Sequence, residues 1–114
     1  MGKIDRPKVY DKYNEHCAYC GKIIHIRDMQ VDHILPKRNG GTNNFSNLNP
    51  SCRQCNYYKK SLDLEDFRKL MKTLHKGLPN DYITALAMNY GIIELKPFNG
   101  VFYFERNEKE GNND

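Results

Sequence analysis

Two pairs of cysteines, each separated by two residues, are the part of this chain whose spacing most clearly fits metal chemistry. They are Cys17 with Cys20 and Cys52 with Cys55, and they are the only four cysteines. Two thiols about one turn apart can occupy two corners of a tetrahedron around Zn²⁺, so the pairs predict one structural Zn(Cys)₄ site. Two disulfides, or four unrelated buried cysteines, are the alternatives. The segment between Cys20 and Cys52 is longer than the roughly 15–20 residues usual in such sites, so the metal would hold the ends of a long insert.

That insert contains polar residues of the types used in hydrolysis. Imidazole has a pKa near 6.5, so a neutral histidine can take a proton from water at cellular pH. Carboxylate and amide oxygens are ligands for hard divalent cations. In chain order these residues are Asp32 and His33, the basic loop KRNGG at 37–41, Asn47, and Asn56 directly after the last cysteine.

The same residues resemble the motif of the HNH endonuclease family. The family pattern of DHI-P, a GG loop, NL and CxxCNxxK matches the chain from Cys17 to Lys60, which is 44 of its 114 residues. The resemblance implies a ββα-metal finger: one strand ending at the Asp-His pair, a loop, a second short strand after Asn47, and a helix beginning near Cys52. Asn56 stands where the family's name has its second histidine, which is a common variant.

The resemblance also implies a role for each residue of the motif. His33 would be the general base, while Asp32 and Asn56 would bind a catalytic divalent cation. Asn47 would fix the loop and orient His33 through a backbone contact. Oxygen ligands favour Mg²⁺ or Mn²⁺ over zinc at this second site, with Ni²⁺ as a further alternative. Because neighbouring residues on a regular strand point to opposite faces, Asp32 and His33 can share a site only if the strand bends or ends there.

Positive charge is concentrated around the motif. The formal charge of the whole chain is +4, but the segment from Cys17 to Lys60 holds seven basic and two acidic residues, a balance of +5. Such a concentration is expected where a phosphate backbone binds, and a solvated surface without a partner is the alternative. The residues that we expect to contact DNA, mainly at its phosphates, are Lys37, Arg38, Arg53, Lys59 and Lys60.

The remaining sequence predicts one small α+β domain over residues 1–106, made of a catalytic finger at about 17–60 and an extension at 61–106. We expect residues 107–114 to be a disordered polar tail. In the helix from Arg53, Cys52, Cys55 and Lys59 would share one face, and at least one of Tyr57 and Tyr58 would pack in the core. The other expected elements are helices at 7–15, 61–77 and 81–90, strands at 22–26 and 29–34, and a hairpin of 92–98 with 101–105 around Asn99-Gly100.

Composition limits the class of protein. Hydrophobic residues make up 39% of the chain and charged residues 28%, which is ordinary for a globular protein. No apolar run approaches the roughly 20 residues that a membrane span needs. We therefore expect a cytoplasmic protein without a membrane partner, in a compartment where thiols stay reduced and available to zinc.

The sequence thus predicts a metal-dependent DNA endonuclease stapled by zinc. Products with 5′-phosphate and 3′-hydroxyl ends are implied by the family resemblance alone. One finger contains one site, so a monomer would nick DNA, whereas cutting both strands would need a homodimer or two binding events, and the hairpin offers a dimer edge. A non-catalytic zinc module that binds nucleic acid or protein is the alternative. A nuclease for RNA or for branched or modified DNA is a third hypothesis.

Overall fold

The structure is a computed structural model that describes residues 2–106. It divides into two compact units. Among the described residues, the finger unit combines 2–64 with 101–106, and the helical unit comprises 65–100. The predicted tail at 107–114 lies outside the described residues. In the part of the chain that is described, no helix is long and apolar enough to cross a membrane.

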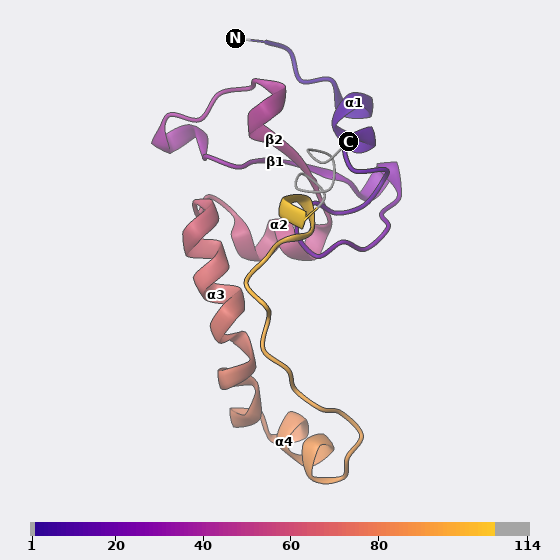
Figure 1. Ribbon diagram of the computed structural model, residues 1–114, viewed down its shortest axis with the longest axis vertical. Helices are drawn as coiled ribbons and strands as arrows, with labels where there is room; N and C mark the ends of the chain where they lie inside the picture. The colour runs from indigo at the N-terminus through magenta and orange to yellow at the C-terminus, as the bar shows by residue number, and fades with distance from the viewer. Residues whose placement is uncertain (1, 107–114) are drawn as a thin grey trace. The chain divides into compact units, whose positions relative to one another are not determined.

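The finger unit is built on a two-stranded antiparallel sheet followed by a helix (Figure 1). Strand β1 spans Gln30–His33 and strand β2 spans Leu48–Ser51, with Asp32 opposite Asn49 and His33 opposite Leu48. Helix α2, Arg53–Lys59, begins directly after β2, with Cys52 as its N-cap. The order is β, β, α, so the predicted α+β finger is confirmed.

Helix α1, Arg6–Asp11, precedes the sheet and is capped by Asp5, whose side chain accepts from the Lys8 amide. It ends earlier than the predicted helix at 7–15. The strand expected at 22–26 is absent: Ile23 forms only an isolated bridge with His16, and the chain enters a 3-10 turn at Ile26–Asp28. Of the three isoleucines in this run only Ile24 is buried, so the run lacks the sustained burial that would hold a strand.

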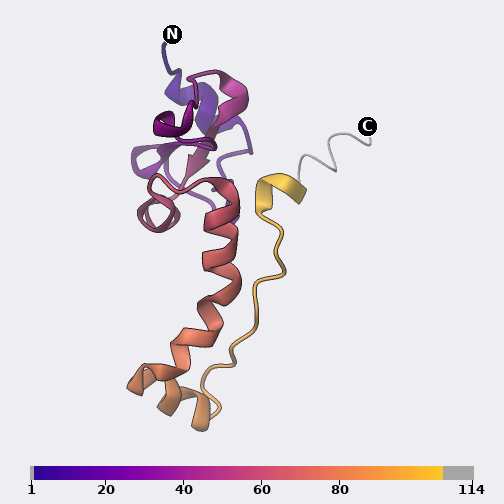
Figure 2. The same ribbon diagram turned by 90° about the vertical axis from the view of Figure 1, so that its left-hand side faces the viewer.

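The helical unit contains the two helices that the sequence predicts. Helix α3, Leu64–Gly77, carries the long amphipathic repeat, and helix α4, Tyr82–Asn89, begins after Asp81, whose carboxylate accepts from the Thr84 amide. A 3-10 turn at Leu78–Asn80 joins them. The chain then returns without regular secondary structure through residues 93–99, and the Arg68 guanidinium on α3 donates to the Gly100 carbonyl at 2.6 Å (Figure 2).

The predicted C-terminal hairpin is wrong. Residues 93–99 form no ladder, Pro97 cannot donate to one, and residues 103–106 are helical. The segment after Gly100 packs against the first cysteine turn instead: the Tyr103 and Phe104 amides donate to the carbonyls of Tyr19 and Ala18. Phe102 and Phe104 are buried with ring centroids 5.4 and 5.7 Å from that of Tyr19. The aromatic residues after Gly100 thus serve the finger's core, and the hairpin edge that was expected to offer a dimer contact is not formed in residues 92–105.

Candidate functional site

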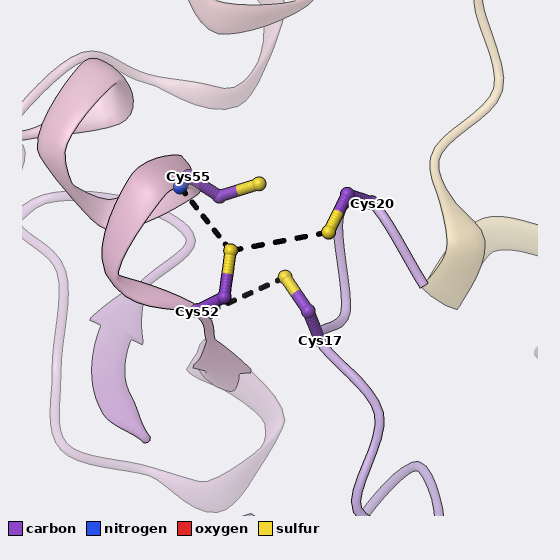
Figure 3. A group of neighbouring side chains, drawn as sticks. All are labelled: Cys17, Cys20, Cys52 and Cys55. Carbon is purple, nitrogen blue, oxygen red and sulfur yellow. Dashed lines mark hydrogen bonds between the residues drawn. The ribbon is translucent and has the colours of Figure 1, made fainter. Parts of the chain in front are cut away.

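The four cysteines form a cluster with the geometry of a tetrahedral metal site (Figure 3). Their sulfur atoms all lie within 4.8 Å of one another, and the Sγ atoms of Cys20 and Cys52 are 3.9 Å apart. Four thiolates around Zn²⁺ at about 2.3 Å have sulfurs roughly 3.8 Å apart, so the cluster fits zinc. The amide of Cys52 donates to the sulfur of Cys17 at 3.3 Å, which stabilises thiolate charge. The predicted clustering of the four cysteines is therefore confirmed, and their arrangement suggests zinc.

The thiols of this cluster are electrostatically unequal. Hydrogen bonds from Cys20 and Cys55 lower the pKa of Cys17. The hydrogen bond to Cys17 is the main cause that raises the pKa of Cys20 to about 11, and the same kind of contact raises the pKa of Cys55. Without a cation the cluster therefore favours one thiolate hydrogen-bonded by neighbouring thiols. A divalent cation is what would allow all four to ionise.

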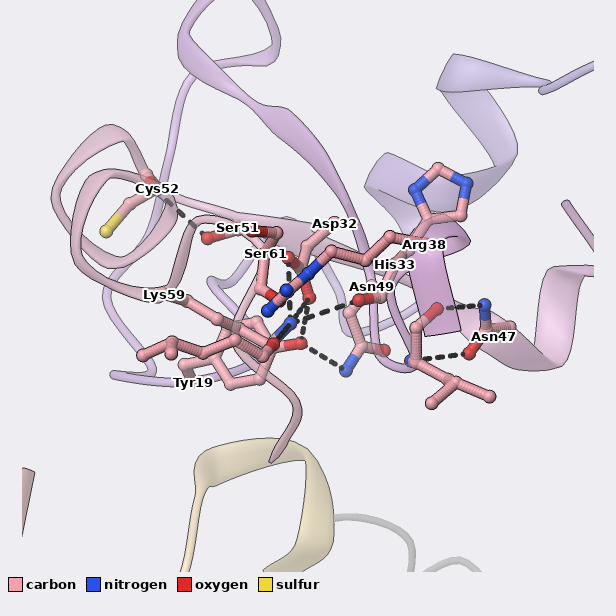
Figure 4. A network of polar contacts seen from close by, with 12 residues as sticks. Tyr19, Asp32, His33, Arg38, Asn47, Asn49, Ser51, Cys52, Lys59 and Ser61 are labelled. Atoms are coloured by element: carbon pink, nitrogen blue, oxygen red, sulfur yellow. Dashed lines mark hydrogen bonds and ion pairs between the residues drawn. The ribbon is translucent and has the colours of Figure 1, made fainter. Parts of the chain in front are cut away.

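Asp32 is almost completely enclosed, with 3% of its surface exposed. The Lys59 ammonium lies 3.2 Å from its Oδ1 and 3.1 Å from its Oδ2, and the Tyr19 hydroxyl also donates to Oδ2 (Figure 4). Burial raises the pKa of the Asp32 carboxyl, while Tyr19 and Lys59 act in the opposite direction. Burial and the nearby Asp32 raise the pKa of Tyr19 well above its usual value, so Tyr19 stays a hydroxyl donor at neutral pH.

The burial of Lys59 contradicts the prediction that this residue contacts DNA. Its side chain is fully buried, and its ammonium also donates to the carbonyls of His33 and Leu62, each at 3.0 Å. An ammonium enclosed by protein acceptors is not available to a phosphate backbone. Lys59 lies one and two turns after Cys55 and Cys52, on the helix face that the zinc site directs inward, and this spacing was the signal in the sequence that Lys59 would be buried.

His33 ends strand β1, and its ring points away from the Asp32 carboxylate (Figure 4). Its Nε2 lies 2.8 Å from Oδ1 of Asn43. Because an amide oxygen only accepts, this contact assigns the proton to Nε2 and leaves Nδ1 as the basic nitrogen. No motif distinguishes Asn43 from the other asparagines of its loop, so sequence reasoning missed it.

Asn47 fastens the loop that follows β1. Its Oδ1 accepts from the Leu35 amide at 2.8 Å, and its Nδ2 donates to the carbonyls of Leu35 and Thr42 at 3.1 and 2.9 Å. Its own carbonyl accepts from the Ile34 amide, next to His33. These contacts agree with the predicted role of fixing the loop. The loop also requires Gly41, since a Cβ there would lie 1.7 Å from the Leu35 carbonyl oxygen.

A pocket of about 230 Å³, here called the site pocket, is lined by Asp32, His33, Asn56, Lys37 and Lys60 together with Val31, Pro36 and Ser61. It brings together the predicted base, both predicted cation ligands and two of the predicted phosphate contacts. The side chains of Asp32 and Asn56 both offer oxygen atoms, which are the ligands that a hard divalent cation prefers, and both line this pocket. Their chemistry therefore fits such an ion. Because Lys59 contacts both carboxylate oxygens, an ion at Asp32 would have to displace it from at least one.

The two predicted arginine contacts lie outside the site pocket. Arg38 donates to the Ser61 carbonyl through Nε at 3.1 Å and Nη2 at 2.8 Å, which ties the KRNGG loop to the end of α2. Arg53 forms an ion pair with Asp28 at 3.4 Å, and 70% of its side chain is exposed. An exposed pair of this kind is weak, so Arg53 remains able to exchange Asp28 for a phosphate.

Together, the ββα order, the cysteine cluster and the Asp-His pair at the strand end define a zinc-stapled metal-finger nuclease class. Comparison with known families agrees: the model of the family described as HNH endonuclease matches residues 17–71. This segment of the chain belongs to the HNH endonuclease family.

A curated relative similar to the chain is the CRISPR-associated endonuclease Cas9 of Corynebacterium diphtheriae. It is 41% identical over 49 residues, which is 42% of this chain and 4% of that protein. The chain therefore corresponds to a small part of this relative. No solved structure matches the chain.

Proposed function

We propose that this chain is a metal-dependent DNA endonuclease that hydrolyses phosphodiester bonds with His33 as general base. The observation that carries the proposal is the site pocket, which is lined by His33, Asp32 and Asn56 together with two exposed lysines, Lys37 and Lys60. Family membership supports the nuclease class, and the relative's printed name is that of an endonuclease. A reducing, cytoplasmic setting remains a prediction from the cysteine content.

In this proposal Nδ1 of His33 takes the proton of the attacking water, while Asn43 holds Nε2–H and so fixes the tautomer. Asn47 closes the loop behind the histidine, which limits the positions that the ring can take. Lys37 and Lys60 draw the phosphate into the site pocket. The reaction would leave 5′-phosphate and 3′-hydroxyl ends, as the family resemblance implies.

Asp32 and Asn56 are the residues that would hold the catalytic cation, Mg²⁺ or Mn²⁺ with Ni²⁺ as the alternative. Bound there, the ion would supply positive charge to the reacting phosphate and its leaving oxygen. One such site in a monomer would nick DNA, and double-strand cutting would require two sites.

The test is cleavage of supercoiled plasmid by zinc-loaded protein with added Mg²⁺ or Mn²⁺. Wild type should give relaxed circles, and His33→Ala should lose this activity while keeping its zinc content and thermal unfolding. His25→Ala is the matched control, since His25 is exposed and contacts only the Arg27 amide of its own turn among the interactions described. Equal yields of relaxed circle from wild type and His33→Ala would favour the non-catalytic zinc module instead.

A further inference from the structure

One face of helix α2 carries aromatic and basic side chains in alternation. Arg53 and Tyr57 are spaced at i and i+4 in α2 and therefore project from the same side, and the ammonium of Lys60, which follows the helix, lies over the Tyr57 ring. Tyr57 is 62% exposed and Tyr58 is 60% exposed, which corrects the expectation that at least one would pack in the core. Their rings meet edge to face with centroids 5.1 Å apart. Two large aromatic rings kept in solvent forgo the burial that usually stabilises such side chains.

Lys60 holds a backbone conformation that few residues with a side chain adopt, with φ 47° and ψ −120°. Its amide closes α2 by donating to the Asn56 carbonyl at 2.8 Å, and its ammonium lies 4.9 Å from the centroid of the Tyr57 ring. Strained residues of this kind persist where the surroundings enforce them, and they cluster at functional sites. Here the strain keeps a cation beside an exposed ring.

The hollow that Tyr57 lines shares Asn56 with the site pocket. Tyr57 lines a shallow hollow of about 260 Å³ together with Gln30, Arg53 and Asn56. Asn56 and Lys60 in turn line the site pocket. A DNA strand whose phosphate lies in the site pocket would therefore present its next sugar and base to Tyr57, with Arg53 and Lys60 within reach of the neighbouring phosphates.

We propose that Tyr57 is a stacking platform for an unpaired base, so that the preferred ligand is a single-stranded or locally unpaired DNA strand. In a duplex the faces of the bases are covered by their neighbours, whereas an unpaired base exposes a face that an aromatic ring can cover. Lys60 and Arg53 supply sequence-independent attraction to the phosphates on either side. The proposal rests on the proposed function only for the position of the scissile phosphate, and binding can be measured without cleavage.

The experiment uses zinc-loaded full chain without added Mg²⁺ or Mn²⁺ and compares binding to a single-stranded oligonucleotide with binding to its duplex. Tyr57→Ala should weaken single-strand binding on the order of ten-fold and leave duplex binding within two-fold, because stacking contributes about 1–3 kcal/mol per base. Tyr57→Phe should bind like wild type. Tyr82→Ala, which removes a tyrosine that is 95% exposed on α4, should change neither. An oligonucleotide containing 2-aminopurine should report stacking by its emission in wild type and lose that signal in Tyr57→Ala.

Salt dependence separates stacking from charge. Lys60→Ala should lower the slope of log affinity against log salt by about 0.7, the value for one phosphate of a single strand, whereas Tyr57→Ala should leave the slope unchanged. Lys60→Gly should weaken binding like Lys60→Ala yet unfold at a higher temperature than Lys60→Ala, because glycine tolerates this backbone conformation. The proposal is overturned if Tyr57→Ala binds the single strand like wild type, weakens both forms equally, or weakens it no more than Tyr82→Ala. None of these outcomes depends on nuclease activity, so failure here leaves the plasmid test unaffected.

Discussion

Replacing Lys59 by methionine would remove the charge that balances the buried Asp32 while keeping an unbranched side chain of similar length. At the observed 3.1 Å separation and an effective dielectric constant of about 20, the attraction between the two charges is about 5 kcal/mol. Removing one member of a buried ion pair typically costs about 3–5 kcal/mol, since the other charge stays desolvated. We expect Lys59→Met to lower the free energy of unfolding at pH 7 by about 3–5 kcal/mol. This is a large fraction of the total free energy of unfolding of a natural domain, which is roughly 5–15 kcal/mol.

The loss should depend on pH in a direction that the structure fixes. Burial already raises the pKa of Asp32, and removal of Lys59 takes away one of the groups opposing that shift. A carboxyl whose folded pKa lies above its unfolded value of about 3.9 contributes stability below that value and loses it as pH rises through the folded pKa. Lys59→Met should therefore be nearly as stable as wild type near pH 4 and most destabilised at neutral pH, as long as zinc occupancy is measured and matched.

Denaturant unfolding of four proteins completes the test: wild type, Lys59→Met, Asp32→Asn and the double variant. The double variant should recover most of the stability lost in Lys59→Met, because no buried charge remains unpaired. Mn²⁺ should stabilise Lys59→Met more than wild type, since in this variant the ion no longer competes with the Lys59 ammonium for the Asp32 carboxylate. A loss under 1 kcal/mol at pH 7 for Lys59→Met, or the same loss with and without Asp32, would refute the reasoning.

Three further results are expected. Zinc binding at pH 7 should release fewer than four protons per ion, because Cys17 already favours the thiolate. Calorimetry in buffers of different ionisation enthalpy measures the number of protons released, and a value of four would contradict this expectation. Gly41→Ala should cost about 1–3 kcal/mol in thermal or denaturant unfolding because its Cβ would overlap a backbone oxygen, whereas Gly77→Ala, with open space around it, should cost nothing. Asn43→Ala should lower kcat with little change in KM, because the His33 ring would lose the partner of its Nε2–H, and an unchanged kcat would count against its proposed role.

The finger itself is readable from the sequence because its determinants are local. Cysteine spacing places the metal site, Pro36 follows the end of β1, and Cys52 caps the helix that follows β2. The residues that complete the site are not readable in this way, because they depend on pairs distant in the chain. Tyr19 reaches Asp32 across 13 residues, and Lys59 reaches it across 27.

General rules about exposure account for the other errors. Because lysines are rarely fully buried, Lys59 is predicted to contact DNA. Because aromatic residues are often buried, at least one of the two tyrosines of α2 is predicted to pack in the core. The Asn99-Gly100 signal predicts a hairpin turn, and Gly100 does adopt a positive φ of 89°. It did not bring two strands together, because Phe102 and Phe104 bury their rings against Tyr19 and the residues before the turn have no ladder partner.

Tyr19 links the metal site to the chemistry of the finger. It lies between the zinc ligands Cys17 and Cys20, its ring is covered by Phe102 and Phe104, and its hydroxyl holds the carboxylate that neighbours the proposed base. A metal that fixes the two flanking sulfurs also fixes this turn, and with it the position of the hydroxyl. A zinc ion bound by the four sulfurs would thus do more than compensate for a small core: by fixing this turn it would also set where the Tyr19 hydroxyl holds Asp32.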